Sequence, residues 1–252
     1  MKPIQKVIVA FILSVCFLAI GGALLLIGGY WFSYHQGSQV YENIQELAIT
    51  PAESPSSADP TEPEEHPYPT IDFEILREKN PDVIGWIYIP GTRINYPIVK
   101  RQNDNDYYLS HLFDGTENKS GSIFLDTRCS QEDEHILIHG HNMGNGTMFR
   151  DLNQFRSRNF LDSHPTFWIL TPEEVYEIQI FSCSIVGLDS PVWQLEFPTT
   201  GSKQSWLTDC HAAAYIRTKV KPSASDQIVT LSTCSYEFDQ ARWIVQGILK
   251  AI

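Results

Sequence analysis

The sequence predicts a mainly β protein, an eight-stranded closed or nearly closed barrel with a few short helices, preceded by one N-terminal transmembrane helix. Two observations favour it. Short segments rich in β-branched and aromatic residues, divided by turn residues, follow one another from position 84, and a long uncharged apolar run lies near the N-terminus. The length of 252 residues suits one domain with appendages. The net charge of −12 argues against a nucleic-acid partner, because binding phosphates requires a basic surface.

The apolar run covers residues 7–32, VIVAFILSVCFLAIGGALLLIGGYWF, and contains no charged residue. It is longer than the roughly 20 residues that span a bilayer as a helix. Lys2 and Lys6 precede it, and no Lys or Arg follows before Arg77. We therefore expect a single-pass anchor in the cell membrane, with residues 1–6 in the cytoplasm and the rest outside. The alternative is a cleaved signal peptide, whose apolar region usually has about 7–15 residues.

Residues 33–70 are expected to form an extracellular linker between the anchor and a folded domain. The part from 51 to 70, PAESPSSADPTEPEEHPYPT, is dense in Pro, Ser and acidic residues and has too few apolar residues to fold. The domain is expected over residues 71–252. It opens with one short amphipathic helix, IDFEILREKNPD, which buries Phe73 and Leu76.

Eight strands and two further helical segments are expected in this domain. Turn chemistry separates the strands, such as PG at 90–91 and GNG at 144–146. The helical segments are 148–155 and 203–217. The strands are 84–89, 94–99, 122–125, 135–138, 167–170, 175–184, 228–233 and 243–249.

The five cysteines include Cys16 in the apolar run, which leaves four for the domain. No CxxC pair occurs, so we do not expect a structural zinc site. Buried free thiols are expected for Cys129, Cys183 and Cys210, because free Cys packs as a small hydrophobe. A disulfide between two of these three is the alternative.

The segment IVTLSTC at 228–234 ends in a cysteine at a strand terminus. Strand alternation places Cys234 and Ser232 on one face, where the strand meets the loop SYEFDQA. The next strand starts near Arg242, and in a hairpin Cys234 and Arg242 face each other. A guanidinium there is suited to stabilise a thiolate, or to donate hydrogen bonds to a carbonyl oxygen that gains negative charge. Taken singly, each residue has a simpler explanation, an inert core thiol or a solvated arginine.

The segment HILIHGHNMGNGTMF supplies a candidate acid and base. His135, His139 and His141 alternate onto one strand face, and His141 is the last of them before a turn. An imidazole there can take the proton of a thiol and later donate one to a leaving amine. The alternative is a metal site, because HGH is good ligand spacing on a strand. No Asp follows at short spacing, however, and Cys234 would then have no role.

Together these motifs resemble those of class B sortases, membrane-anchored cysteine transpeptidases of Gram-positive bacteria. The resemblance covers roughly residues 71–252. TLSTC at 230–234, followed by Arg242 and WIVQGIL, is similar to the family's nucleophile strand, loop and arginine strand. LIHGHNMGNGTMF is similar to its histidine motif. Three segments are similar to its N-terminal strands and loops: NPDVIGWIYIPGTRINYPIVK at 80–100, NDYYLSHLFDG at 105–115 and KSGSIFLD at 119–126.

The resemblance implies the family's eight-stranded barrel with added helices, of which the predicted helix at 203–217 would be the last. It implies that Cys234 is the nucleophile, His141 the general acid and base, and Arg242 the group that orients the carbonyl. It also suggests residues of a substrate-binding groove: Asn105, Leu109, Ser232, Thr233, Tyr215 and Ile216.

Two positions depart from the family's usual pattern. His139 stands where an aromatic residue is common, and Ser235 where an acidic residue is common. Both are expected at the edge of the groove, so they bear on substrate preference rather than on the chemistry.

The function implied by the resemblance is cleavage of a C-terminal sorting signal after Thr, through a thioester on Cys234. The surface protein is then transferred to an amine of the peptidoglycan precursor or cross-bridge. This chemistry needs no metal or organic cofactor. Other function classes stay open: a secreted cysteine protease in which water resolves the same acyl-enzyme, a non-catalytic surface-anchored binding module, and a zinc hydrolase.

Overall fold

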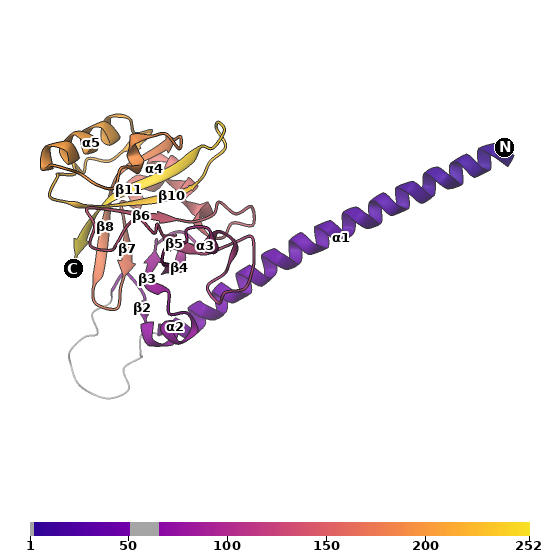
Figure 1. Cartoon of the computed structure of the whole chain (residues 1–252), viewed down its shortest axis with the longest axis horizontal. Coiled ribbons are helices and arrows are strands. Elements are labelled where there is room, and N and C mark those ends of the chain that lie inside the picture. Colours follow the sequence, from indigo (N-terminus) through magenta and orange to yellow (C-terminus); the bar gives the residue numbers. More distant parts are fainter. Residues whose placement is uncertain (1–2, 51–65) are drawn as a thin grey trace.

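The computed structural model describes residues 3–50 and 66–252, and its central sheet closes on itself (Figure 1). The closed sheet consists of β3 (Val83–Tyr88), β4 (Asn95–Val99), β5 (Ile123–Leu125), β6 (His135–His139), β7 (Thr166–Leu170), β8 (Val175–Val186), β10 (Gln227–Cys234) and β11 (Arg242–Ala251). Their order is β11–β10–β6–β5–β4–β3–β7–β8, and β11 also pairs with β8. The predicted eight-stranded barrel is confirmed, and each predicted strand limit lies within two residues of the observed one.

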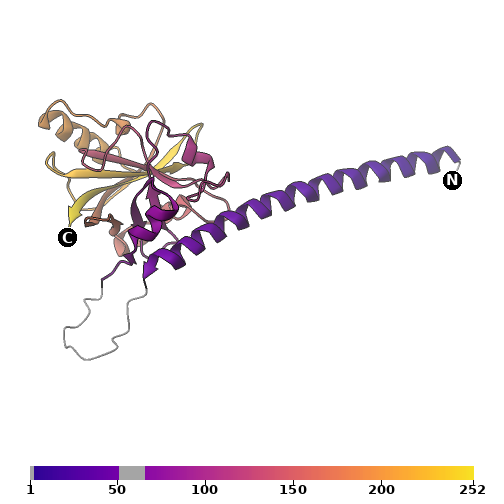
Figure 2. The ribbon, with the colours of Figure 1, turned by 60° about the horizontal axis from the view of Figure 1, so that its bottom comes forward.

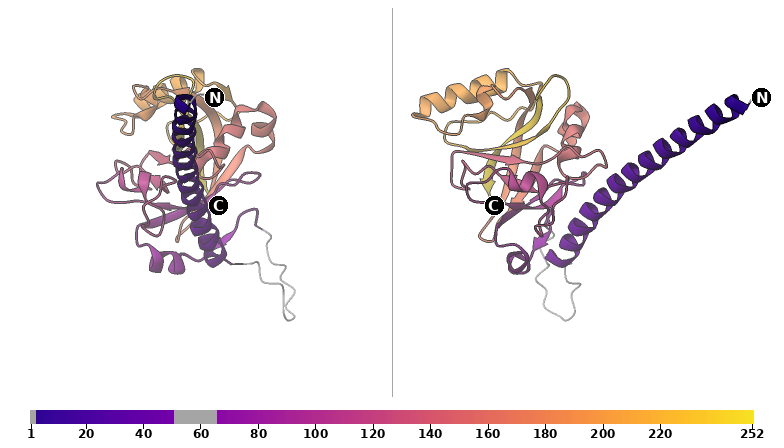
Figure 3. Two further views of the ribbon diagram at one scale, coloured as in Figure 1. Left: turned by 90° about the vertical axis from the view of Figure 1, so that its right-hand side faces the viewer. Right: turned by 45° about the vertical axis from the view of Figure 1, so that its right-hand side comes forward.

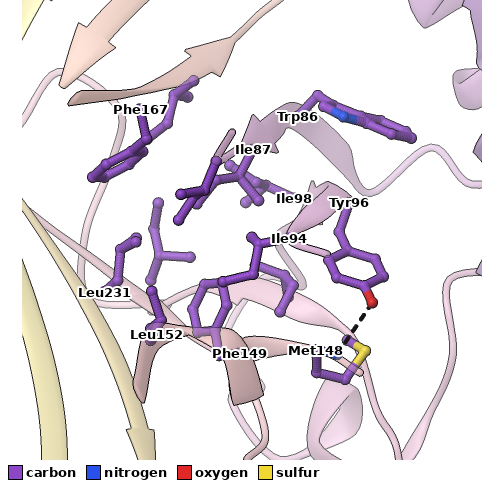
Figure 4. Packing of buried hydrophobic residues seen from close by; sticks show 14 of the residues in the cluster. Trp86, Ile87, Ile94, Tyr96, Ile98, Met148, Phe149, Leu152, Phe167 and Leu231 are labelled. Carbon is purple, nitrogen blue, oxygen red and sulfur yellow. Dashed lines mark hydrogen bonds between the residues drawn. The ribbon is translucent and has the colours of Figure 1, made fainter. Parts of the chain in front are cut away.

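Apolar side chains from several strands fill the barrel and fix the positions of the strand ends. Figure 4 shows residues of β3, β4, β7, β10 and the 3-10 helix η1 (Phe149–Arg156) gathered in this core, among them Ile87, Ile98, Phe167 and Leu231. Closure leaves the barrel strands no unpaired edge. The residues that directly follow β6 and end β10 are therefore held in fixed positions at one end of the barrel, called here the rim.

The predicted helices are all present, but both ends of the last one differ from the prediction. α2 (Phe73–Lys79) and η1 lie where they were expected, and Leu76 is buried. α5 (Thr200–Ala212) begins earlier and ends earlier than the predicted helix at 203–217. A capping box between Thr199 and Ser202 starts it, and the chain then forms β9 (Ile216–Arg217), which pairs with β8. The other short helices are α3 (Tyr107–Ser110), α4 (Arg158–Ser163) and η2 (Pro191–Trp193).

The N-terminal helix α1 (Pro3–Ala48) includes the predicted membrane span and continues beyond it. Its stretch from Phe11 to Ala48 is long and apolar enough to cross a membrane, with a mean hydropathy of 2.6 in its most apolar window. Figures 2 and 3 show the N-terminal part of this helix extending away from the barrel. One helix with this composition is consistent with a membrane anchor.

The last turns of α1 differ from the predicted linker, because they pack on the barrel. Tyr41, Ile44 and Ala48 are buried, and their spacing of three and four residues places them on one helix face. β1 (Ile49–Thr50) then pairs with β2 (Thr70–Ile71). Most of the predicted Pro- and acid-rich segment, residues 51–65, lies outside the described residues.

The cysteines are free thiols, as expected. Cys129 and Cys183 are buried, whereas Cys210 and Cys234 are partly exposed. Burial raises the pKa of Cys129 to about 11 and that of Cys210 to about 12, and it raises the pKa of Cys183 further. These three thiols therefore stay protonated and unreactive near neutral pH.

A buried chain of hydrogen bonds runs through His135, whose ring packs against Trp206 of α5. Its Nδ1 lies 2.8 Å from the Gln194 carbonyl oxygen, which accepts, so Nε2 accepts the hydrogen bond from Thr230 Oγ1 at 2.7 Å. Gln246 Nε2 in turn donates to Thr230 Oγ1. This order of donors and acceptors requires a neutral His135. Burial lowers its pKa to about 4.

Acidification is therefore expected to destabilise the protein through His135. Between pH of about 6.5 and about 4 the unfolded chain binds a proton at this residue and the folded chain does not, so the free energy of unfolding falls by up to about 1.4 kcal/mol per pH unit. Urea unfolding of wild type and His135→Gln in detergent, followed by tryptophan fluorescence at several pH values, measures this. The variant is expected to lose less stability across the window, and parallel curves would exclude the effect.

Candidate active site

A cavity of about 350 Å³ opens where β6 and β10 end and β11 begins. Seven of the nine predicted site residues line it: Asn105, Leu109, His141, Ser232, Thr233, Cys234 and Arg242. They come from four separate segments of the chain. The barrel therefore brings together residues that the sequence keeps more than a hundred positions apart.

Cys234 and Arg242 are directly opposite each other in the sheet. Cys234 is the last residue of β10 and Arg242 the first of β11, and the two form an antiparallel pair. Directly opposite residues share a face, with Cβ atoms about 4.5–5.5 Å apart. Arg242 Nη1 donates to the carbonyl oxygens of Gln240 and Ala241, at 3.3 and 3.1 Å. The loop backbone thus holds one end of the guanidinium beside the thiol.

His141 reaches the same rim from β6. β6 runs parallel to β10 with His139 beside Ser232, and the Gly140 N–H donates to the Ser232 carbonyl. Two residues further along both segments, His141 and Cys234 line the same cavity. Asn142 Nδ2 supports this arrangement by donating to the Cys234 carbonyl oxygen at 2.7 Å.

One hydrogen bond assigns the two ring nitrogens of His141. Nε2 lies 2.7 Å from the Leu109 carbonyl oxygen, which can only accept. Nε2 therefore carries a proton and donates it to this bond. Nδ1 is left as the nitrogen that can exchange a proton with a group in the cavity.

The buried carboxylate of Asp126 holds the part of the cavity wall that Asn105 and His139 form. Asn105 Nδ2 and His139 Nε2 both donate to Asp126, at 3.1 Å each, and Arg128 pairs with it through two nitrogens. Burial alone would raise the pKa of Asp126, but the hydrogen bonds from His139, Arg128 and Asn105 outweigh it and hold the pKa well below its ordinary range. The charged carboxylate therefore holds the side chains of Asn105 and His139 in place, and both line the cavity.

Ser235, the other position that departs from the family pattern, does not line the cavity. Its hydroxyl accepts from Arg156 Nη2 at 2.7 Å and donates to Glu237. The Arg156 guanidinium also lies over the Trp243 ring, 4.3 Å from its centroid. These contacts tie the loop that follows Cys234 to η1.

Tyr215 and Ile216 lie outside the cavity, contrary to the groove prediction. Tyr215 packs edge-on against Trp243, and Ile216 is buried in β9 opposite Cys183. The prediction followed the assumption that the helix continued to residue 217. Because α5 ends at Ala212, this segment joins the sheet instead.

Two apolar residues of the cavity wall were not predicted from the sequence. Leu188 and Trp193 line the cavity, and Trp193 Nε1 donates to the Gly187 carbonyl at 2.8 Å. The tryptophan in the loop LDSPVWQ could have indicated this, because a large aromatic side chain in a polar loop often packs against another part of the protein. The rest of the lining comes from Asp106, Phe124, Arg128, Leu137, His139 and Gly140.

The described residues contain no group of three or more His, Cys, Asp or Glu side chains that could hold a metal ion. His139 is instead engaged by Asp126, and His141 by the Leu109 carbonyl. The lining of the cavity includes a thiol, an imidazole and a guanidinium, from Cys234, His141 and Arg242.

Comparison with known proteins agrees with this arrangement. The sortase domain family matches residues 87–250. The chain is 34% identical to sortase B of Listeria monocytogenes over 239 residues, which is 92% of this chain and 97% of that protein. The structure of Bacillus anthracis sortase B in complex with AAEK1 has a TM-score of 0.74 and 28% identity, covering 88% of this chain and all of that one. A Staphylococcus aureus sortase B–substrate complex has a TM-score of 0.67 and 27% identity, covering 71% and 85%. The barrel, the rim thiol and this similarity together show that the chain belongs to the sortase family of cysteine transpeptidases, and within it to class B.

Proposed function

We propose that this chain cleaves a C-terminal sorting signal after Thr and joins the surface protein to an amine of the cell wall. The observation that supports it most is the convergence of Cys234, His141 and Arg242 on one cavity. A thiol, an imidazole and a guanidinium are together suited to acyl transfer through a covalent intermediate.

In the first half-reaction the proton of the Cys234 thiol passes to His141 Nδ1. The sulfur then bonds to the carbonyl carbon of Thr. Arg242 donates hydrogen bonds to the oxygen as negative charge develops on it. The carbon–nitrogen bond breaks, and the departing amine takes the proton from His141, which leaves a thioester.

In the second half-reaction the amine of the acceptor attacks the thioester carbon. Its nitrogen loses a proton to His141, the new amide bond forms, and the Cys234 sulfur leaves as a thiolate, which takes the proton back from His141. Hydrolysis would follow the same path with water, so the identity of the product depends on which nucleophile reaches the thioester first.

The sorting signal is proposed to lie along the cavity. Asn105 offers an amide fixed by Asp126, and Leu109 offers an exposed apolar side chain on the same wall. Ser232 and Thr233 approach the signal beside the nucleophile. We assign the apolar part of the opposite wall to Leu188 and Trp193, and not to Tyr215 and Ile216.

We further propose that residues 7–32 anchor the protein, with the N-terminus inside and the barrel outside. The cationic residues that precede the span and the lack of any in the segment that directly follows it support this orientation. The catalytic unit then includes the end of α1 in addition to residues 71–252, because Tyr41 and Ala48 are part of its core.

Transfer is expected to be separable from hydrolysis by adding an acceptor. The full chain in detergent is incubated with a library of peptides that contain Thr, with and without short glycine peptides or diamino acids. Mass spectrometry is expected to find a ligated product that increases with amine concentration while hydrolysis falls. Hydrolysis that is unaffected at every amine concentration would favour the protease alternative.

A further inference from the structure

The end of the anchor helix is joined to the catalytic histidine by a continuous set of contacts. Residues 118–122, called here the bridging loop, contact α1 on one side and α3 and His141 on the other. Nothing in the chemistry proposed above uses this loop or the helix.

Polar contacts hold α1 to the bridging loop. Asn118 Nδ2 donates to the Ser33 carbonyl at 2.9 Å. Further along the helix, the Tyr41 hydroxyl donates to the Gly121 carbonyl at 2.7 Å and lies 2.9 Å from Ser122 Oγ. Tyr41 is 4% exposed, and burial raises its pKa, so its hydroxyl stays a donor throughout the working pH range.

The bridging loop in turn holds the segment that binds the imidazole. The Ser122 N–H donates to the Tyr108 carbonyl at 2.9 Å, and Ser122 Oγ donates to the His111 carbonyl at 2.9 Å. These carbonyls flank Leu109, whose own carbonyl accepts the hydrogen bond from His141 Nε2. The position of Leu109 is therefore fixed from the side of α1.

Gly121 brings the loop against the ring itself. A Cβ on Gly121 would lie 3.1 Å from His141 Cδ2 and 2.9 Å from the Leu109 carbonyl oxygen, and its φ is +56°. Only the absence of a side chain permits this approach. The Tyr41 hydroxyl donates to the carbonyl of this same residue, so Gly121 alone separates the hydroxyl from the imidazole ring.

We infer that Tyr41 is a positioning residue for His141, acting through Gly121, Ser122 and Leu109, so that the end of the anchor helix forms part of the support of the active site. The inference rests on the proposed role of His141. Without the hydroxyl, the bridging loop and the Leu109 carbonyl are free to shift, and the Nδ1 atom is less well aimed at the thiol. The sorting signal is also held by Asn105, which Asp126 fixes independently of α1, so its binding is affected less than kcat.

Tyr41→Phe tests this, because it removes the hydroxyl and keeps the ring that packs edge-on against Tyr96. The full chain in detergent is expected to lose about threefold to tenfold in kcat, the scale of one buried hydrogen bond, with KM for the sorting peptide nearly unchanged. The pH profile of kcat/KM is expected to change as well. The pH dependence of Cys234 alkylation by iodoacetamide gives a readout that needs no turnover.

Gln45→Met is the matched control. Gln45 Nε2 also donates from α1 to a backbone carbonyl at 2.7 Å, that of Asn95, which pairs with Tyr88 of β3 and not with the bridging loop. This variant is expected to keep wild-type kcat and both pH profiles, even where its thermal stability falls as much as that of Tyr41→Phe. Ser122→Ala is expected to act like Tyr41→Phe, because it removes the next link.

Identical kinetics and pH profiles for Tyr41→Phe and Gln45→Met would overturn the inference. That result is distinct from a failure of the proposed function, which would appear as a wild-type enzyme that forms no thioester on Cys234.

Discussion

Cys234→Ala is expected to abolish turnover, with a loss in kcat of at least about a thousandfold. The thiol is the strongest nucleophile that lines the cavity, because the Ser232 and Thr233 hydroxyls beside it are much weaker, and His141 and Arg242 exchange protons or donate hydrogen bonds. The side chain is only partly buried, at the end of β10, so its removal leaves no cavity in the core. The variant should therefore fold with nearly unchanged thermal stability.

The measurement is mass spectrometry of the enzyme mixed with a cleavable sorting peptide. Wild type is expected to gain the mass of the acyl fragment on the peptide that contains Cys234, and the variant is expected to gain none. Cys210→Ala is the control, since Cys210 is also partly buried but lies in α5, away from the cavity. Wild-type turnover by Cys234→Ala would end the proposal of covalent catalysis at this residue.

The barrel was predictable because each strand carries its own local signal. IVTLSTC and WIVQGIL are β-branched and apolar, and the turn residues between such segments mark the strand ends. The same signals placed Cys234, Arg242 and His141 at strand termini. Sequence reasoning succeeds where local preference and final position agree.

The parts that were missed depend on contacts between distant segments. The residues around Tyr41 give no indication that its hydroxyl donates to the carbonyl of Gly121, 80 residues later. Trp193 and Tyr215 are both aromatic residues in the same long connection, and packing alone decides that Trp193 lines the cavity while Tyr215 covers Trp243.

His139 shows a further case. The sequence marked it as a departure from the usual aromatic residue, but its partner Asp126, the last residue of KSGSIFLD, was given no role. In the structure the His139 imidazole and the Asp126 carboxylate lie 3.1 Å apart. The same carboxylate accepts a hydrogen bond from Asn105. A residue that looks isolated in sequence is thus paired with a carboxylate that directly follows the neighbouring strand β5.

Arg242→Lys is expected to lower kcat by about a hundredfold, the scale of losing one donor to a developing oxyanion. The arginine can do two things at once because its guanidinium is a planar fork. Nη1 donates to the Gln240 and Ala241 carbonyls, and among residues 3–50 and 66–252 no hydrogen bond engages Nε or Nη2. These two groups are available to the substrate oxygen.

A lysine has a single nitrogen at the end of a flexible chain, so it cannot hold the loop carbonyls and reach the oxygen in a fixed geometry. We therefore expect the loss in kcat with a smaller change in KM, and unchanged thermal stability, measured by steady-state kinetics with a sorting peptide. Arg158→Lys is the control, because Arg158 Nη1 also donates to a backbone carbonyl, that of Arg217, but lies outside the cavity. Near-normal kcat in Arg242→Lys would show that the positive charge alone suffices, and the fork would then have no special part in stabilising the oxyanion.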